Sequence, residues 1–433
     1  MKRLYSNELK EHIGEEVLIQ GFLFQKRIMG NINFLLIRDK FGIVQCVVKD
    51  KDQIEILKDV MDESVLEITG NCVEEKRSSI GVEIHNPKVN IISKVKYPLN
   101  IEINKPIINA NIDTILDNRA ISLRSPLIRS VFNIQAQMAK AFREFADKNG
   151  SKEIFIPTIV GSATEGGSEL FEIKYYDKKA YLGQSGQLYK QMMVGVFERV
   201  YAISHSYRAE KFGTSRHTSE FIQYEFEMGF IKDYMDVINF GIDIIRYIKD
   251  SVEKENIEDL KIINKELPLI PKNIPIMKLK EAQDLIFEKE NIDHRGEKDL
   301  SPEDEKLISK IIKDLYKSDL VVITHYPTSK RPFYTMPDPQ NPEETLSFDF
   351  ILRGLEILTG SQRIHEYEQL ILAIEKKGLD PKNYEDYLEI FKYGMPHEGG
   401  FGMGFERLTQ QFLSLSNIRE ATLFPRDVKR ITP

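Results

Sequence analysis

Apolar and polar positions alternate over short runs in residues 15–96, a period typical of strands with one buried face. The runs read EEVLIQGFLF, NFLLIR, GIVQCVVK, SVLEITGNCV and VEIHNPKVNII. Between the third and the fourth run, Ile54, Leu57 and Met61 recur at helical spacing. Five strands with a helix after the third are typical of an OB-fold barrel, whose face binds single-stranded nucleic acid. A barrel that serves only for packing is the alternative that the pattern leaves open.

Periodicity is weak over residues 97–127, where proline and asparagine recur, so this stretch is predicted to be a linker. A long helix ending at Gly150 is predicted next, from apolar positions at helical spacing: Val131, Ile134, Met138 and Phe142. Beyond Leu170, strand-like runs alternate with helical segments at 187–197 and 233–254, which favours an antiparallel sheet flanked by helices. We therefore expect an α+β protein, with an N-terminal OB-fold β-barrel in residues 1–98, a hinge or linker in 99–127 and a larger domain in 128–433.

Bulk properties exclude several classes of protein. The chain has 433 residues, of which 41% are hydrophobic, enough for a large core and a smaller module. No stretch approaches the roughly 20 apolar residues of a membrane helix, so we expect a cytoplasmic protein without membrane contact. Cys46 and Cys72 form neither a CxxC motif nor a Cys/His cluster, which leaves structural zinc and disulfides unsupported. The net charge of −7 confines any nucleic-acid contact to local patches.

The stretch SYRAEKFGTSRHTSEFIQYEFEMGF, residues 206–230, is predicted to form a strand, a loop and a second strand. Arg208 and Glu210 lie two positions apart, so on a strand both side chains would point to one face. Arg216 and His217 fall on the connecting loop, and Phe221 offers a flat ring for a purine. Such a hairpin can clamp a polyphosphate, because guanidinium groups match phosphate oxygens. A surface hairpin with scattered charges is the alternative.

A second stretch, GGFGMGFERLTQQF, spans residues 399–412. Its four glycines allow close backbone approach, and Arg407 begins a predicted helix. The spacing is neither GxGxxG after a parallel strand nor GxxxxGK[ST], so Rossmann and P-loop nucleotide sites are both excluded. Alone, this glycine run is weak evidence of function.

Together the two stretches resemble motifs 2 and 3 of the class II aminoacyl-tRNA synthetases, and the helix 129–150 with the segment up to Pro157 resembles motif 1. Further segments resemble the aspartyl branch of that family, in its archaeal and eukaryotic-core type: GNINFLLIRDKFGIVQ, GSATEGGSELF, GQSGQLYKQ, RPFYTMPD, SFDFILRGLEILTGSQRIHEYE and NIREATLFPRD. The resemblance covers nearly the whole chain in order. It implies an anticodon-binding barrel in residues 1–98, a class II catalytic domain in 128–433 and a homodimer.

The resemblance also implies roles at an ATP site. Arg208 would contact the α-phosphate and the aminoacyl carboxylate, where charge develops as pyrophosphate leaves. Arg216 and His217 would hold the β- and γ-phosphates, and Phe221 would stack on adenine. The implied ATP-binding set is Arg208, Glu210, Arg216, His217, Phe221, Glu356, Gly404 and Arg407, with Arg208, Glu210 and Arg407 as the catalytic residues. Asp349, Glu356 and Thr359 would organise Mg²⁺, which prefers oxygen ligands.

Amino-acid choice depends on two cations. A second substrate carboxylate is costly to bury unpaired, so an aspartate pocket needs fixed positive charge. Lys190 and Arg363 match the positions that pair this carboxylate in the aspartyl branch. The implied aspartate-binding set is Glu165, Ser185, Gln187, Lys190, Arg208, Thr359 and Arg363. Departures from the family pattern are Gly186 in place of proline, His205 and Tyr207 in place of proline and phenylalanine, and Glu398 in place of histidine.

The barrel would bind the tRNA anticodon. The resemblance implies that Phe34 stacks on the central base, Gln45 reads a base edge and Arg27 meets backbone or base. Members restricted to tRNA-Asp often carry tryptophan where this chain has Phe24, and lysine near Ser79. Phe24 and Ser79 therefore favour the relaxed type, which also accepts tRNA-Asn.

The expected function is that of an aspartate–tRNA ligase, which activates L-aspartate with ATP and passes it to the 3′ end of tRNA-Asp, with tRNA-Asn as an open second substrate. One alternative is an asparaginyl-tRNA synthetase, against which Lys190 and Gln191 argue. Another is a paralogue that transfers activated aspartate to ammonia, although such paralogues usually lack the barrel. A noncatalytic scaffold is disfavoured by the intact charged residues of both motifs.

Overall fold

The computed structural model describes residues 1–433 except 30–31, 106, 163–168 and 212. The chain divides into two compact units, Met1–Ser125 and Pro126–Pro433. The segment 99–127, predicted as a linker, carries two short helices of the first unit, α2 (Ile112–Asp117) and α3 (Arg119–Ser122). Asn111 caps α2 by accepting a hydrogen bond from the Thr114 amide, which explains how a helix forms among chain-breaking residues.

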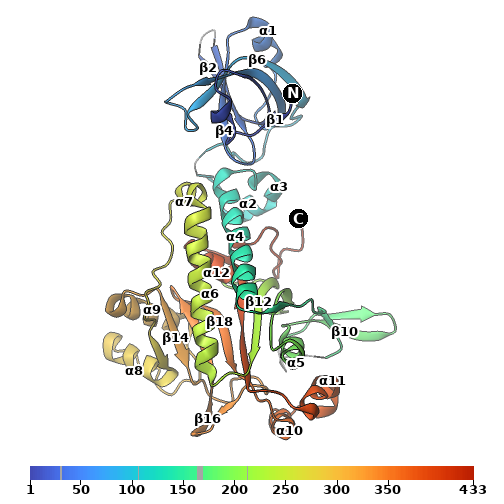
Figure 1. Ribbon diagram of the computed structural model, residues 1–433, viewed down its shortest axis with the longest axis vertical. Coiled ribbons are helices and arrows are strands. Elements are labelled where there is room, and N and C mark those ends of the chain that lie inside the picture. Colours follow the sequence, from blue (N-terminus) through green and yellow to red (C-terminus); the bar gives the residue numbers. More distant parts are fainter. Residues whose placement is uncertain (30–31, 106, 163–168, 212) are drawn as a thin grey trace. The chain divides into compact units, whose positions relative to one another are not determined.

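The first unit is a closed five-stranded barrel with one extra edge strand (Figure 1). Its strands are β1 (Arg3–Leu4), β2 (Glu16–Met29), β3 (Ile32–Arg38), β4 (Ile43–Val48), β5 (Val65–Glu74) and β6 (Val82–Ser93). The order is β1-β2-β3-β4-β6-β5, and pairing of β2 with β5 closes the barrel. Helix α1 (Lys51–Ile56) lies between β4 and β5, as predicted for an OB-fold, although it ends before Met61.

Alternation along the strands fills the barrel interior. On β2, Val17, Ile19 and Leu23 point inward, while Leu18, Gln20 and Phe22 are partly exposed. Cys46 and Cys72 are buried, free thiols within this core. The two cysteines therefore act as small apolar residues.

The second unit is built on an eight-stranded, mainly antiparallel sheet of order β13-β14-β17-β18-β19-β12-β11-β7. Its strands are β7 (Lys152–Glu153), β11 (Arg199–Tyr207), β12 (Glu220–Gly229), β13 (Ile276–Lys278), β14 (Leu320–Thr324), β17 (Ser347–Leu352), β18 (Leu355–Gln362) and β19 (Glu398–Gly404). Parallel pairing occurs at the two edges, between β13 and β14 and between β11 and β7. The predicted antiparallel sheet flanked by helices is thus confirmed.

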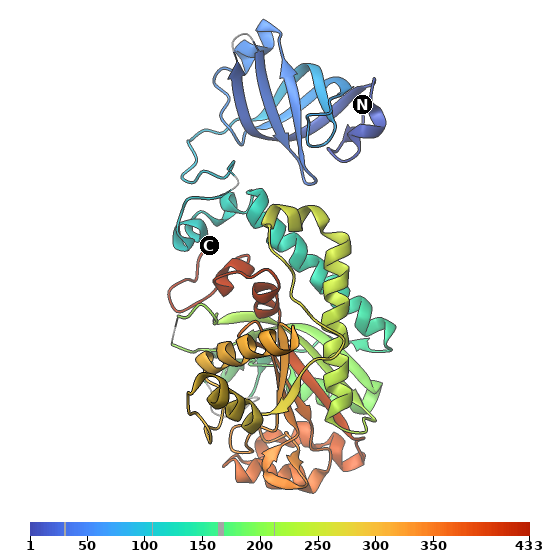
Figure 2. The same ribbon diagram turned by 90° about the vertical axis from the view of Figure 1, so that its left-hand side faces the viewer.

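Two long helices, α4 (Pro126–Lys148) and α6 (Tyr234–Glu255), pack against each other and cover one face of this sheet (Figures 1 and 2). Phe226 of β12, Phe350 of β17 and Phe401 of β19 point into the core beneath these helices. Because side chains alternate across a strand, the residues on either side of these aromatic positions must point to the opposite face. That opposite face carries the candidate site.

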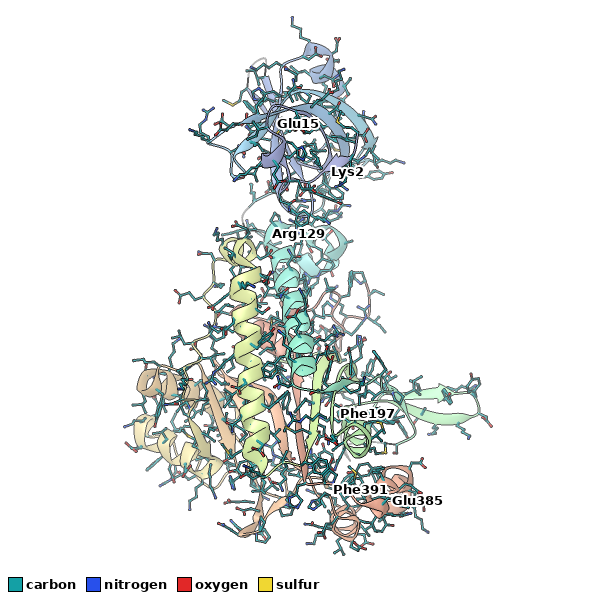
Figure 3. The ribbon with its side chains drawn as sticks, viewed as in Figure 1. Lys2, Glu15, Arg129, Phe197, Glu385 and Phe391 are labelled. Atoms are coloured by element: carbon teal, nitrogen blue, oxygen red, sulfur yellow. The ribbon has the colours of Figure 1, made fainter. Side chains whose placement is uncertain are left out.

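Smaller helices surround the opposite face. Helices α8 (Leu279–Glu290) and α9 (Pro302–Tyr316) pack beside β13 and β14, and α5 (Gln187–Phe197) packs on β11 and β12. Side chains of α5 also pack near α11 (Glu385–Leu388), in the region where Figure 3 labels Phe197, Glu385 and Phe391. No helix in the described part of the chain is both long and apolar enough to cross a bilayer.

Candidate active site

The open face of the sheet holds a polar cavity of about 310 Å³. Among the predicted residues, the cavity is lined by Ser185, Gln187, Lys190, Arg208, Glu210, Arg216, His217, Phe221, Glu356, Thr359, Arg363, Gly404 and Arg407. Asp349 lies behind the lining, in contact with Thr359. Glu165 falls within 163–168 and lies outside the described residues. The structure therefore brings together segments more than 200 residues apart in the sequence.

One end of the cavity contains two buried cations, each paired with a buried carboxylate. Lys190 on α5 is 1% exposed, and its Nζ lies 2.6 Å from Glu225 Oε2 and donates to the carbonyl of Phe401 at 2.7 Å. Arg363 donates from Nε to Glu227 Oε1 at 2.7 Å. Its Nη1 donates to Ser361 Oγ, also at 2.7 Å. The pairing fixes both cations without leaving an isolated buried charge.

Sequence reasoning missed Glu225 and Glu227. Both lie on β12 in the run QYEFEMG, where acidic residues alternate with Tyr224 and Phe226. A period of two, with aromatic residues on one side and carboxylates on the other, is a signal of a strand between a core and a charged cavity. That signal was present in the sequence and could have identified both residues.

The glycines of β19 make room for these carboxylates. Gly400 lies against the backbone of Phe226 and the carboxylate of Glu227, so closely that any Cβ would overlap them. A Cβ on Gly402 would lie 3.4 Å from Gln223 Nε2 and 3.6 Å from Glu225 Oε2. The close approach predicted from the glycine run is thus an approach to the side chains of β12.

The segment before α5 closes the cation end of the cavity. The backbone N–H of Gly186 donates to Glu225 Oε1 at 3.0 Å, and Ser185 Oγ accepts a hydrogen bond from the Gln187 amide. A Cβ on Gly186 would overlap the terminal carbon of Ile156. This contact accounts for glycine at a position where the sequence departs from the family pattern.

The other end of the cavity is rich in arginine. Strand β11 ends at Tyr207, so the prediction that Arg208 and Glu210 lie on a strand was wrong. Both side chains nevertheless line the cavity, because the Arg208 amide donates to the carbonyl of Ser219 and continues the hairpin for one residue. The Arg208 guanidinium carbon lies 5.4 Å from the ring centre of Phe221.

The loop residues Arg216 and His217 complete this arginine-rich end. Arg216 Nη2 donates to Glu305 on α9, and its buried Nη1 has no hydrogen-bond partner among the described residues. Burial, together with the charges of Arg407, Arg216 and Arg208, lowers the pKa of His217 to about 4. His217 is therefore neutral near pH 7 and offers a hydrogen bond without a charge.

Helix α12 (Phe405–Phe412) begins two residues before Arg407, so Arg407 lies in its first turn and does not begin the helix as predicted. Its Nη1 donates to the carbonyl of Glu356 at 3.0 Å. No role was predicted for Arg331 from the sequence. Its Nη2 donates to Asp349 Oδ2 at 2.7 Å. It comes from the loop after β14, and only the fold places it at this cavity.

Three oxygen-bearing side chains lie together beside the arginine-rich end. Thr359 Oγ1 lies 2.5 Å from Asp349 Oδ1 and 3.3 Å from Glu356 Oε1. Burial raises the pKa of Asp349 to about 6, whereas for Glu356 the charges of Arg407 and Arg331 outweigh burial and lower the pKa. The described residues include no cluster of three or more His, Cys, Asp or Glu that could hold a metal alone. Two carboxylates and a hydroxyl suit a Mg²⁺ ion that is also bound by substrate phosphates.

Behind the two cations lies a buried polar layer around Glu398. Glu398 Oε1 accepts a hydrogen bond from Gln191 Nε2 at 2.9 Å, and Gln191 Oε1 accepts one from the Tyr387 hydroxyl at 2.9 Å. The backbone carbonyl of Glu398 accepts from the Arg363 amide. Burial, and then the charge of Glu227, raises the pKa of Glu398 well above its usual range. The side chain therefore stays protonated over a range of pH in which an exposed glutamate is ionised.

Replacing this acid should stabilise the protein at neutral pH. Because the pKa of Glu398 is raised in the folded state, the unfolded chain ionises first as the pH rises above about 4.3, so Glu398 lowers the free energy of unfolding as pH rises. Glu398→Gln removes this dependence, with a limiting slope of about 1.4 kcal/mol per pH unit. We expect the melting temperature of the variant, relative to the wild type, to increase between pH 4.5 and pH 7.5. A difference that does not change with pH would contradict the assignment.

The first unit presents a separate candidate surface for nucleic acid. Arg27 of β2 lies opposite Phe34 of β3, and Gln45 of β4 lies opposite Leu36, so the three predicted residues share one face. Gln45 Nε2 donates to Glu83 Oε1 at 2.6 Å. The structure thus brings Arg27, Phe34 and Gln45 together.

Phe24 is not part of this group of three residues. It lies at a bulge between Leu23 and Gln25, where the register of β2 shifts by one residue. Its ring centre is 5.6 Å from the guanidinium carbon of buried Arg38, and it lines a different cavity, together with Lys26 and Asp62. A bulge of this kind is not visible in the alternation of the sequence.

Two family models match the chain. Residues 111–428 match the model described as tRNA synthetases class II (D, K and N). Residues 17–92 match the model described as an OB-fold nucleic acid binding domain. The matched ranges cover the main sheet and the barrel respectively.

Curated relatives align with the chain from end to end. It is 41% identical over 431 residues to an "Aspartate--tRNA(Asp/Asn) ligase" of Thermus thermophilus, covering all of both chains. It is 37% identical to an "Aspartate--tRNA(Asp) ligase" of Thermococcus kodakarensis, covering 99% of both. Among solved structures, asparaginyl-tRNA synthetase of Pyrococcus horikoshii complexed with asparaginyl-adenylate superposes with a TM-score of 0.93 at 31% identity, covering all of both chains.

Proposed function

The chain belongs to the class II tRNA synthetases of the D, K and N group, and we propose that it is an aspartate–tRNA ligase. It activates L-aspartate with ATP to aspartyl-adenylate and transfers the aspartyl group to the 3′ end of tRNA. The observation that carries the choice of aspartate is the pair of buried cations, Lys190 and Arg363, at one end of the cavity. Relatives named as aspartate–tRNA ligases at 37 to 41% identity support the same choice.

The two cations suit a substrate with a second carboxylate. Lys190 is paired with Glu225 and also lies 3.5 Å from Glu227, the partner of Arg363, so two carboxylates balance the two cations before substrate binds. A substrate carboxylate placed between Lys190 and Arg363 gains two fixed donors, whereas a carboxamide would present its N–H groups to cations that cannot accept hydrogen bonds. This asymmetry supports aspartate over asparagine.

The arginine-rich end suits ATP. Arg208, Arg216 and Arg407 approach it from the hairpin and from α12, and neutral His217 adds a donor. In the proposed reaction the aspartate carboxylate displaces pyrophosphate, so catalysis depends on positioning and on neutralising the charge that develops. Mg²⁺, held by Asp349, Glu356 and Thr359 together with the phosphates, would neutralise further charge on the polyphosphate.

The barrel is the unit proposed to bind tRNA. Phe34, Arg27 and Gln45 share a face suited to stacking and base contacts, which supports anticodon binding there. We further propose that both tRNA-Asp and tRNA-Asn are substrates. A relative named for tRNA(Asp/Asn), matched over the whole length, supports this, as does phenylalanine rather than tryptophan at position 24. The cytoplasm, where protein synthesis uses these products, is the proposed location.

A homodimer is the proposed assembly. The segment that resembles motif 1 comprises α4 and the chain that follows it, and Phe155 in that chain is 92% exposed. A large aromatic side chain so exposed is suited to burial against a second copy.

The proposal is tested by ATP–pyrophosphate exchange with purified protein, using aspartate and asparagine separately. We expect exchange with aspartate and none above background with asparagine. Charging of purified tRNA-Asp and tRNA-Asn then tests the tRNA range. Exchange driven by asparagine alone would instead assign the protein to the asparaginyl enzymes, which its structural neighbour of Pyrococcus horikoshii represents.

Phe34→Ala should impair charging of tRNA without affecting exchange. The ring is expected to stack on an anticodon base, and such stacking contributes about 1 to 3 kcal/mol, or roughly 5- to 150-fold in kcat/KM for tRNA. Phe41→Ala is the matched control, because Phe41 is an exposed aromatic of the same unit that packs on Tyr5. An equal loss in both variants, or a loss of exchange, would rule out the stacking role.

A further inference from the structure

Glu305 joins three elements at the arginine-rich end of the cavity. Its side chain accepts a hydrogen bond from Arg216 Nη2, on the hairpin loop, and one from the backbone N–H of Glu356 on β18, at 2.8 Å. Glu305 itself lies in the first turn of α9 and is 7% exposed. No other described residue is hydrogen-bonded to both Arg216 and Glu356.

The position of Glu305 is set by a well-defined helix start. Ser301 Oγ accepts a hydrogen bond from the Asp304 amide, and the Asp304 side chain accepts one from the Ser301 amide, which forms a capping box. Pro302 occupies the first helical position, where its fixed backbone angle favours the helix. The first turn of α9 is therefore held in place independently of Arg216.

The contact with Glu305 uses only part of the hydrogen-bonding capacity of the Arg216 guanidinium group. A guanidinium group has five N–H donors, and here Nη2 is held by Glu305 while Nη1 is buried without a hydrogen-bond partner among the described residues. Arg216 lines the cavity. A buried donor without a partner is costly, so this nitrogen is suited to an acceptor that arrives with a ligand.

We propose that Glu305 is a positioning residue for ATP: by holding Arg216 Nη2 and the backbone of Glu356, it directs Arg216 Nη1 to a phosphate oxygen. The inference rests on the proposed function, because it takes the ligand at this end to be ATP. It adds α9, which lies outside the sequence motifs that resemble the family, to the elements that build the site. Glu305 acts through Arg216 and Glu356, and no contact with the substrate is assigned to it.

Ser309 offers a matched control on the same helix. It lies one turn after Glu305, on the same face, and its Oγ accepts a hydrogen bond from the Gly354 amide at 2.9 Å. Ser309→Ala therefore removes a contact between α9 and the β17–β18 connection without changing the contact with Arg216. It measures how much a weaker attachment of α9 affects the site in general.

The experiment measures the KM for ATP and for aspartate in pyrophosphate exchange, and ATP binding without aspartate by calorimetry, for Glu305→Ala, Glu305→Gln and Ser309→Ala. We expect Glu305→Ala to raise the KM and Kd for ATP about tenfold or more, while the KM for aspartate changes less than twofold. Glu305→Gln keeps an acceptor of similar shape and should recover most of the affinity. Ser309→Ala should resemble the wild type.

Two outcomes would overturn the proposal: unchanged affinity for ATP in Glu305→Ala, or equal losses for ATP and aspartate in both alanine variants. If Glu305→Ala does not fold, Glu305→Leu decides, because leucine fills similar space without an acceptor. A folded Leu variant with the affinity of the wild type for ATP would remove the positioning role. Measurements on the wild type distinguish failure of the proposed function from failure of the positioning role. A wild type without aspartate-dependent exchange but with ATP binding weakened by Glu305→Ala would reject the aspartate assignment and keep the positioning role.

Discussion

Arg208→Ala should reduce aspartate-dependent pyrophosphate exchange by at least 10²- to 10³-fold, the usual effect of removing one preorganised donor from a developing charge. Arg208 follows β11 and lines the arginine-rich end of the cavity. From there a guanidinium can contact both the attacking carboxylate and the α-phosphate as negative charge shifts to the leaving pyrophosphate. The loss should appear mainly in kcat, because the interaction strengthens in the transition state.

The control for this prediction is Lys211→Ala. Lys211 is an exposed cation three residues further along the same loop and does not line the cavity. We expect it to keep the exchange activity of the wild type, and circular dichroism should show both variants folded. A folded Arg208→Ala protein with exchange within tenfold of the wild type would remove the assignment of Arg208 to the reacting centre.

The parts of the site that sequence reasoning found are those that lie on short contiguous runs. Arg208, Arg216 and His217 fall within ten residues, and Arg407 lies in the first turn of the helix that follows the glycine run. Their residue types fit phosphate, and the order of the motifs along the chain made the family resemblance specific. The layout of the barrel followed from alternation in the same way, since a period of two is sufficient to define which face of a strand is buried.

The parts that sequence reasoning missed depend on long-range packing. Arg331 reaches the cavity from a loop, and Glu305 reaches Arg216 from a helix. The local sequence of neither segment carries a phosphate-binding signal. Glu225 and Glu227 alternate with aromatic residues along β12, and they can be identified from the sequence only by asking which face of that strand is charged. Phe24 lies at a bulge of β2, a feature that depends on the partner strands rather than on the residue itself.

The pairing of each cation with a glutamate has an energetic consequence for any test of specificity. A cation that is removed leaves a buried carboxylate without its partner, and such changes cost about 3 to 5 kcal/mol of stability. Among the described residues, Glu225 would keep only the Gly186 amide as a donor if Lys190 were lost. Loss of activity in a single variant could therefore reflect unfolding as much as loss of substrate contact.

Lys190→Ala combined with Glu225→Gln separates these two effects. Lys190→Ala alone should lower the free energy of unfolding by roughly 3 to 5 kcal/mol and raise the KM for aspartate far more than the KM for ATP. The added Glu225→Gln removes the unpaired charge, so thermal stability should largely recover. The KM for aspartate should stay raised roughly 10- to 150-fold, since a lost hydrogen bond to a charged group is worth about 1.5 to 3 kcal/mol. Exchange assays and thermal melts of both variants measure the two effects separately. A double variant that binds aspartate as tightly as the wild type would show that Lys190 serves only to neutralise Glu225, and the choice of aspartate would then depend on Arg363 alone.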